Sequence, residues 1–175
     1  KVSKYGKIEI KKYWDVLDNI REIDDNENTI SRDLLQLIEE SVNYRKVSDV
    51  PVGVFLSGGI DSSTNAALFS KRGATKIKTF SIGYKGNNKT YKNELEYARM
   101  VSEDLNSDHF EKLLSADDLI KFLPDMIRLQ DEPISDPVCF PLYYLSKLAK
   151  ENDVTVCQVG EGADELFWGY EYWRK

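Results

Sequence analysis

The tightest constraint on how this chain can fold is the stretch PVGVFLSGGIDSS at residues 51–63. Its first six residues form a short apolar run, rich in β-branched and aromatic side chains, which predicts a buried strand. A glycine pair, Gly58 and Gly59, follows, and residues 60–72 predict a helix stopped by Gly73. A strand, a tight glycine turn and a helix in succession form a site for an anion.

The start of the predicted helix is the physical basis of this anion site. The first backbone N–H groups of a helix have no acceptor inside it, and the aligned peptide dipoles place partial positive charge there. Gly58 and Gly59 permit backbone angles closed to other residues and allow a ligand to approach closely. The hydroxyls of Ser57, Ser62 and Ser63 add hydrogen-bond donors, so the turn predicts a phosphate-binding loop.

Asp61 separates this turn from a Walker loop, which requires a lysine after its second glycine. A carboxylate beside bound phosphates would repel them unless a divalent cation lay between. Asp61 therefore indicates Mg²⁺ held jointly by the protein and a nucleotide. The alternative is a plain strand-to-helix turn with Asp61 in the first helical turn.

Composition and charge argue against several classes of function. The 175 residues suffice for one domain with a core. A formal net charge of −6 disfavours general binding to nucleic acid, which normally rests on clustered Lys and Arg. No apolar run approaches the roughly 18 residues needed to cross a bilayer, and no signal peptide precedes the first motif. We therefore expect a cytoplasmic protein without nucleic-acid or membrane partners.

Cysteine and histidine are not expected to carry chemistry here. Cys139 and Cys157 form no CxxC pair and show no ligand-like spacing to His109, so a structural zinc or a disulfide framework is not expected. Cys157 lies in an apolar run and is expected in the core. His109, the only histidine, begins a predicted strand, and a structural role is favoured over one as acid or base.

The order of the remaining elements predicts an α/β fold with a parallel sheet flanked by helices. Further strands are expected at 77–82, 109–114 and 154–159, and helices at 29–44, 94–105, 116–129 and 140–150, with Ser115 as a cap, a break or kink at Pro124 and a surface loop at 83–93. In such sheets ligands bind at the carboxyl ends of the strands. The residues after Val159 should therefore lie beside the phosphate loop.

The residues that follow the last predicted strand read GEGADELF, at positions 160–167. The glycines permit a close turn, and three carboxylates fall within five residues. We assign Asp61 and Asp164 to Mg²⁺ and Glu161 to contact with substrate or to handling a proton. The alternative is a glycine loop with acidic residues at a helix start.

Four motifs, in order, closely resemble the synthetase domain of glutamine-dependent asparagine synthetases. They are PVGVFLSGGIDSS at 51–63, TFSIGY at 79–84, DEPISDP at 131–137 with PLYYLSKLAKE at 141–151, and GEGADELFWGY at 160–170. The first motif alone resembles the loop of the whole N-type ATP pyrophosphatase superfamily, which includes GMP and NAD synthetases. The resemblance implies an adenine nucleotide alpha hydrolase-like fold.

This resemblance implies ATP and Mg²⁺ as cofactors and a role for each matching residue. Asp61 and Asp164 would bind Mg²⁺, and Glu161 would lie near the activated acyl group and the incoming ammonia. The residues implied to hold the β- and γ-phosphates of ATP are Ser57, Gly58, Gly59, Asp61, Ser62 and Ser63. The adenosine site would be lined by Leu56, Ile82 and Gly160.

The implied reaction is an ATP-dependent amide ligation. A carboxylate attacks the α-phosphorus of ATP, giving an acyl-adenylate and pyrophosphate, and ammonia then displaces AMP. Protein donors and Mg²⁺ around the departing pyrophosphate stabilise charge that grows in the transition state. Aspartate, in asparagine biosynthesis, is the first expected acceptor; another carboxylate, a tRNA-modifying pyrophosphatase and a non-catalytic nucleotide-binding relative are the alternatives.

The resemblance also divides the chain. Residues 1–27 resemble the junction that follows the family's glutaminase domain, and 28–175 resemble the ATP pyrophosphatase domain, truncated at its C-terminal end. We therefore expect a piece of a longer amidotransferase, incomplete as a catalyst alone, that receives ammonia from a glutaminase domain, with a homodimer as one option. The pair Asp136-Pro137 lacks the arginine that some asparagine synthetases carry there for aspartate.

Overall fold

The computed structural model describes residues 1–20, 22, 24–71, 76–86, 94–132, 134, 136–170 and 173. The chain divides into two compact units, residues 1–37 and 38–175. The first unit holds a bridge between Val2 and Ile8, the 3₁₀ helix η1 (Val16–Asn19) and the start of helix α1 (Glu27–Arg45). Every residue of the candidate site belongs to the second unit.

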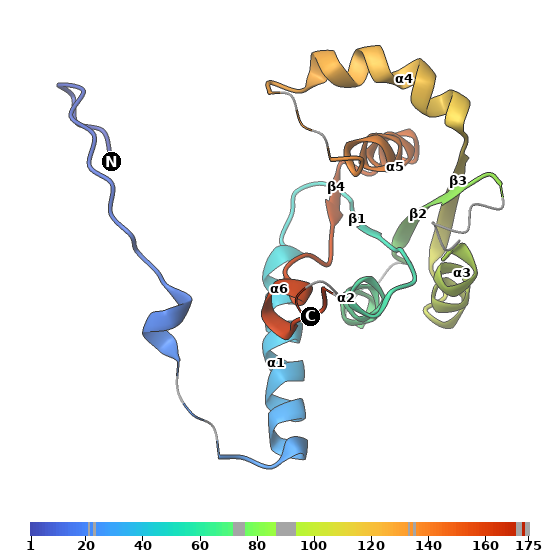
Figure 1. Cartoon of the computed structure of the whole chain (residues 1–175). Helices are drawn as coiled ribbons and strands as arrows, with labels where there is room; N and C mark the ends of the chain where they lie inside the picture. Colours follow the sequence, from blue (N-terminus) through green and yellow to red (C-terminus); the bar gives the residue numbers. More distant parts are fainter. Residues whose placement is uncertain are drawn as a thin grey trace. The chain divides into compact units, whose positions relative to one another are not determined.

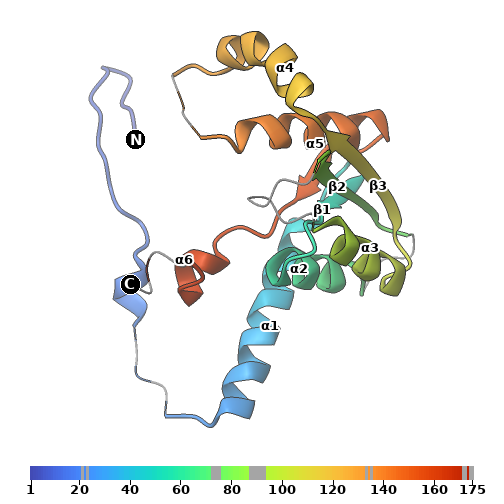
Figure 2. The same cartoon turned by 45° about the vertical axis from the view of Figure 1, so that its right-hand side comes forward.

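A four-stranded parallel sheet forms the centre of the second unit, in the order β3-β2-β1-β4. Its strands are β1 (Val52–Phe55), β2 (Lys78–Tyr84), β3 (Asp108–Leu114) and β4 (Val156–Gln158). The helices that follow α1 are α2 (Ile60–Ser70), α3 (Leu95–Asp104), α4 (Ala116–Leu129), α5 (Cys139–Glu151) and α6 (Ala163–Phe167). Helices α2 and α3 lie on one face of the sheet and α5 on the other, with α4 packed on α5 (Figures 1 and 2). The predicted α/β fold is confirmed.

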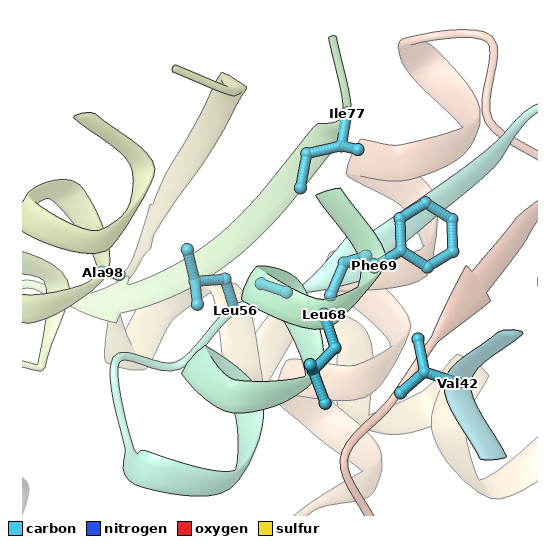
Figure 3. Packing of buried hydrophobic residues seen from close by; sticks show 8 residues of the cluster. Val42, Leu56, Leu68, Phe69, Ile77 and Ala98 are labelled. Carbon is cyan, nitrogen blue, oxygen red and sulfur yellow. The ribbon is translucent and has the colours of Figure 1, made fainter. Parts of the chain in front are cut away.

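The face covered by α2 and α3 carries the first core cluster. Val54 and Leu56 are completely or almost completely buried there and pack with Leu68 and Phe69 of α2 (Figure 3). Val42, from the last turns of α1, belongs to the same cluster. Each such buried aliphatic or aromatic side chain contributes roughly 1.5–3 kcal/mol. These contacts fix α2, and with it the loop before α2, against the end of β1.

The opposite face carries aromatic and small side chains beneath α5. The rings of Phe80 and Phe110 stack at 5.5 Å between centroids. Gly53 makes room for them, since a Cβ on Gly53 would lie 2.7 Å from Cε2 of Phe80. Cys157 packs on this cluster, and burial raises the pKa of its thiol to about 11. Cys157 was predicted as a core residue; it is partly buried and lies at the margin of the core.

Helix α4 runs to Leu129 with Pro124 inside it, so it does not end at the proline. Its start is capped as predicted: Oγ of Ser115 accepts from N–H of Asp118, whose carboxylate accepts from the Ser115 N–H at 2.8 Å. The buried ring of Phe122 stacks on Tyr143 of α5 at 4.0 Å. The cap at Ser115 and the packing of Phe122 stabilise α4 and offset the loss of the hydrogen bond that Pro124 cannot donate. Gly73 and most of the predicted loop at 83–93 lie outside the described residues.

His109 belongs to a polar network between β2, β3 and α3. Its Nδ1 lies 2.8 Å from Oγ1 of Thr79, and its Nε2 lies 3.1 Å from the Glu111 carboxylate. Arg99 donates to both oxygens of Glu111, at 2.8 and 2.6 Å. These contacts agree with the structural role expected for His109. Burial lowers the pKa of His109, and the hydrogen bonds from Arg99 lower the pKa of Glu111.

We predict that the free energy of unfolding falls in two stages on acidification. Below about 6.5, the ordinary pKa of histidine, the unfolded chain takes up a proton on His109 before the folded chain does, which favours unfolding. Glu111 stabilises the fold above its ordinary pKa of 4.5, and this contribution is lost as the pH falls through its lowered folded pKa. Urea unfolding across pH 2.5–7.5 measures both stages.

The variant His109→Gln serves as the control for this prediction. Since the chain has one histidine, the variant should lose the first stage and keep the second. An identical decline between pH 7 and 5.5 in both proteins would contradict the assignment to His109.

Candidate functional site

The strand order places a switch point between β1 and β4. From β1 the chain continues to β2 and β3, and it then returns to the other side of β1 to form β4. Ligands of parallel sheets bind at the carboxyl ends of the strands beside such a point. A cavity of about 740 Å³, which we call the strand-end cavity, opens there. Its wall consists of Phe55, Leu56, Ser57, Gly59, Asp61, Ser62, Phe80, Ser81, Ile82, Gly83, Tyr84, Glu94, Val138, Pro141, Leu142, Leu145, Val159, Gly160 and Glu161.

Two hydroxyls hold the predicted phosphate loop in shape. The N–H of Ser57 donates to Oγ of Ser62 at 3.2 Å, and the two hydroxyl oxygens lie 2.8 Å apart. The N–H of Gly59 donates to Oγ of Ser57 at 3.3 Å. Gly59 is also the N-cap of α2 and supplies no side-chain cap. The first N–H groups of α2 are therefore available to an anion in the cavity.

Gly58 and Ser63, which were predicted to hold phosphate, are not part of the described cavity wall. Gly58 has a φ of +88°, and a Cβ on it would lie 2.7 Å from the backbone nitrogen of Ala98. Gly58 thus allows the loop to pack directly on the start of α3. The Ser63 hydroxyl is buried and has no hydrogen-bond partner among the described residues.

The residues predicted to line an adenosine site, Leu56, Ile82 and Gly160, all belong to the cavity wall. Gly160 brings together two segments that are far apart in the sequence. A Cβ on Gly160 would lie 3.2 Å from the carbonyl oxygen of Asp61 and 3.3 Å from the nitrogen of Ser62. The loop after β4 therefore packs on the backbone of the first turn of α2, as the carboxyl-end rule predicted.

Asp61 and Glu161 lie in the wall, whereas Asp164 does not. The carboxylate of Asp164 is directed at Gly169, whose N–H also donates to the Asp164 carbonyl at 3.0 Å. Within the described ranges, no group of three or more His, Cys, Asp or Glu side chains is arranged to hold a metal. Mg²⁺ needs only one or two protein carboxylates when phosphates and waters complete its shell. Asp61 meets that requirement, and Asp164 would have to turn away from Gly169 to join it.

Several wall residues escaped sequence reasoning. Tyr84 is the last residue of β2, and Glu94 is the N-cap of α3. The strand-end rule applied to β2 would have indicated Tyr84. Helix α5 adds an apolar strip that includes Pro141 and Leu145, which lie at i and i+4 on the helix. Such an apolar wall suits the flat faces of a base. The helical spacing was visible in the sequence, but the side of the sheet that α5 covers was not.

The charged side chains in the described wall of the strand-end cavity are all acidic. Its described wall holds the carboxylates of Asp61, Glu94 and Glu161 and no Lys or Arg. A polyphosphate placed there would meet backbone N–H groups at the start of α2 but also three nearby acids. A divalent cation between the acids and the phosphates removes this repulsion, so the donor set fits a nucleotide bound with Mg²⁺.

A second cavity, of about 410 Å³, adjoins the first. Its wall shares Asp61, Val159, Gly160 and Glu161 with the strand-end cavity. We call it the side cavity. It extends along α1 and α2, away from the sheet edge, and its remaining wall consists of Ile38, Ser41, Val42, Arg45, Ile60, Thr64, Asn65, Gly162, Ala163, Leu166 and Phe167.

The parallel sheet, the glycine loop at the end of β1 and the acidic loop at the end of β4 define a strand-end ligand-binding domain of the α/β class. Residues 33–175 match the model of the asparagine synthase family. The chain belongs to that family.

Relatives among curated proteins carry the same family name. Asparagine synthetase [glutamine-hydrolyzing] 1 of Bacillus subtilis (strain 168) is 36% identical over 170 residues, covering 97% of this chain and 26% of the relative. A putative asparagine synthetase [glutamine-hydrolyzing] of Mycobacterium tuberculosis (strain ATCC 25618 / H37Rv) is 36% identical over 151 residues, covering 86% and 22%. The chain thus spans about a quarter of the length of these relatives.

Among solved structures, the NH3-dependent NAD synthetase from Campylobacter jejuni subsp. jejuni NCTC 11168, in complex with the nitrate ion, is similar with a TM-score of 0.46. It is 21% identical, and the match covers 83% of this chain and 61% of that one. No helix in the described part of the chain has the length and apolar character required to cross a membrane.

The two loop glycines should respond differently to alanine. Gly58→Ala forces a side chain into positive φ and against the backbone of α3, so we expect the free energy of unfolding to drop by about 2–4 kcal/mol. Gly59→Ala should lower it by only about 0.5–1 kcal/mol, the cost of alanine at an N-cap, because Gly59 has a φ of −72° and its added Cβ would lie 3.4 Å from Oγ of Ser57. Urea unfolding measures both.

The second readout for these variants is nucleotide affinity. The Cβ of Gly59→Ala stands on the cavity wall, and we expect it to weaken ATP binding at least tenfold although the fold is preserved. Equal loss of stability in the two variants would show that both glycines serve packing.

Proposed function

We propose that this chain is the synthetase domain of a glutamine-dependent asparagine synthetase and catalyses ATP-dependent amidation of a carboxylate, with aspartate as the acceptor. The observation that carries this proposal is the packing of Gly160 on the first turn of α2, which unites the phosphate loop and the acidic loop around one cavity. Membership of the asparagine synthase family supports it.

The nucleotide would lie across the strand-end cavity. The N–H groups at the start of α2, with the hydroxyls of Ser57 and Ser62, would bind the β- and γ-phosphates. Leu56, Ile82 and Gly160 would contact the adenosine. These groups would then hold the pyrophosphate as it departs, where negative charge increases in the transition state.

Asp61 is the proposed protein ligand for Mg²⁺, with Asp164 as a second ligand once its side chain turns from Gly169. When bound, the ion would supply positive charge between these carboxylates and the phosphates. Glu161 stands in the wall of both cavities. From there its carboxylate would accept a proton from ammonia as the amide forms.

The longer protein is part of the same proposal. We propose that residues 1–27 form the junction to a glutaminase domain that supplies ammonia, and that 28–175 belong to the ATP pyrophosphatase domain. We also propose that the longer protein is cytoplasmic and forms a homodimer.

The decisive experiment measures pyrophosphate release by the full-length protein with ATP, Mg²⁺ and ammonia against a panel of carboxylates. We expect release that depends on aspartate and is matched by equal formation of asparagine. Release with another carboxylate would keep the ligase and change the acceptor. Absence of release with every carboxylate would contradict the proposal in favour of a non-catalytic nucleotide-binding protein.

Asp61→Ala should lower Mg²⁺-dependent pyrophosphate release at least 10²-fold, because the phosphates would lose the cation that offsets the acidic wall. The fold should persist, since the Asp61 side chain is exposed. Asp117→Ala is the matched control, because Asp117 is also an exposed first-turn acid, on α4. Activity of Asp61→Ala equal to that of the control would remove Asp61 from the metal site.

A further inference from the structure

Helix α4 carries an apolar strip that its own packing leaves exposed. The helix packs on α5 (Figures 1 and 2) through the buried ring of Phe122. Beside this packed side, Ile120, Leu123 and Ile127 are 67%, 43% and 64% exposed. They follow one another at intervals of three and four residues, which is the spacing of a seam between two helices. The strip therefore has the pattern that a second helix would cover.

A hollow on the same helix has the form that a facing helix requires. A cavity of about 570 Å³ is lined by Leu123, Met126, Ile127 and Gln130, among other residues. These four residues lie at i, i+3, i+4 and i+7 on α4, and four residues in this arrangement form the hole that receives one side chain of a facing helix. Ile120, three residues before the hole, is an exposed side chain of the apolar kind that such a hole receives.

A second copy of α4, antiparallel to the first, would fill both holes at once. When Ile120 of each copy enters the hole of the other, Leu123 meets Leu123 of the second copy at the centre of the contact. The contact is then closed by a two-fold axis, because the same surface serves both copies. The side chain that inserts and the hole that receives it come from one helix, so the complement of this surface is the surface itself.

The charged residues beside the strip are complementary in the same register. Asp117 and Arg128 are eleven residues apart, close to three full turns, so they lie on the same side of the strip near its two ends. In the antiparallel pair, Asp117 of each copy lies at the level of Arg128 of the other. Within its own helix, Arg128 lies 3.6 Å from Asp125, and both side chains are exposed. An exposed pair of this kind contributes little, so Arg128 can exchange Asp125 for Asp117 across the contact.

We propose that α4 forms a two-fold interface with α4 of a second copy of this chain. This inference rests on the proposed homodimer and names the surface that forms it. A pair of 14-residue helices is a small interface, and we expect a Kd in the micromolar range. No residue of α4 belongs to the described wall of the strand-end cavity or the side cavity, so dimerisation would leave both cavities of each copy intact.

The first test measures the Kd of dimerisation of the full-length protein by sedimentation equilibrium. Ile120→Asp should raise this Kd at least tenfold, because it removes the inserted side chain and brings an unpaired charge into the contact. Met100→Asp is the matched control, since Met100 is an apolar residue of α3 that is exposed to a similar extent, at 65%. Urea unfolding checks that both variants fold.

The second test exchanges the charges. Asp117→Arg and Arg128→Asp, each alone, place like charges opposite one another and should raise the Kd roughly fivefold, whereas the double variant should return it to within about twofold of the wild type. The two positions are about 16 Å apart along the helix, so they cannot pair within one copy. Recovery therefore requires two copies. A mixture of the two single variants should form mixed dimers in preference to dimers of either one.

Pyrophosphate release per chain should stay at the wild-type level in every variant, and this readout separates the inference from the proposed function. A wild-type protein that stays monomeric at about 100 μM, or a dimer whose Kd Ile120→Asp leaves unchanged, would overturn the interface and leave the ligase standing. A free energy of unfolding lowered more by Ile120→Asp than by Met100→Asp, without recovery in the double charge exchange, would assign the strip to another segment of the longer protein and overturn the interface. Dimerisation through α4 without any pyrophosphate release would support the interface and overturn the ligase.

Discussion

The contact between Gly160 and the backbone of α2 is the constraint on which both cavities depend. No side chain separates the loop after β4 from Asp61 and Ser62, and a Cβ would already be 3.2 Å from the Asp61 carbonyl. The pairing of β4 with β1, with Gln158 beside Val54, sets the two loops at the same height above the sheet. Asp61 and Glu161 therefore belong to the walls of both cavities.

The fold was largely predictable because strand patterns, such as the apolar run at residues 52–56, alternate along the chain with helical patterns, such as that at 29–44. Alternation of the two predicts a parallel sheet, but it does not say which strand lies at the centre. That depends on packing: Val54 and Leu56 bury against α2 and α3, while Phe80 packs with Phe110 beneath α5. The last strand is shorter than predicted, since Val154 lies before it, in the α5 cluster. From local propensity alone, a residue such as Val154 could belong to the strand or could be a buried residue that precedes it.

The candidate site, like the fold, was predictable only in part. Ser57, Asp61 and Glu161 lie in the cavity wall because each follows a strand end closely, and the strand-end rule needs only the order of elements. Gly58 and Asp164 do not lie in the cavity wall, and the sequence does not show why. The positive φ of Gly58 directs it to α3, and the side-chain direction of Asp164 depends on a glycine five residues later. Glu94 could not be found without the place of α3, because its own neighbours carry no site pattern.

The distribution of charge between the two cavities bears on the order in which the proposed ligands would bind. Under this proposal, backbone N–H groups in the strand-end cavity would face the phosphates, and the acids of the wall would require a cation beside them. An arginine on that wall would pair with Asp61 or Glu161 and neutralise the acids that the metal needs. The described wall of the side cavity does contain an arginine, Arg45 of α1. Until a metal and a nucleotide were in place, the acidic edge that Asp61 and Glu161 give to both cavities would repel the carboxylate of an acceptor. The same edge would therefore admit the acceptor most readily once the nucleotide is bound, which orders the two ligands by charge alone.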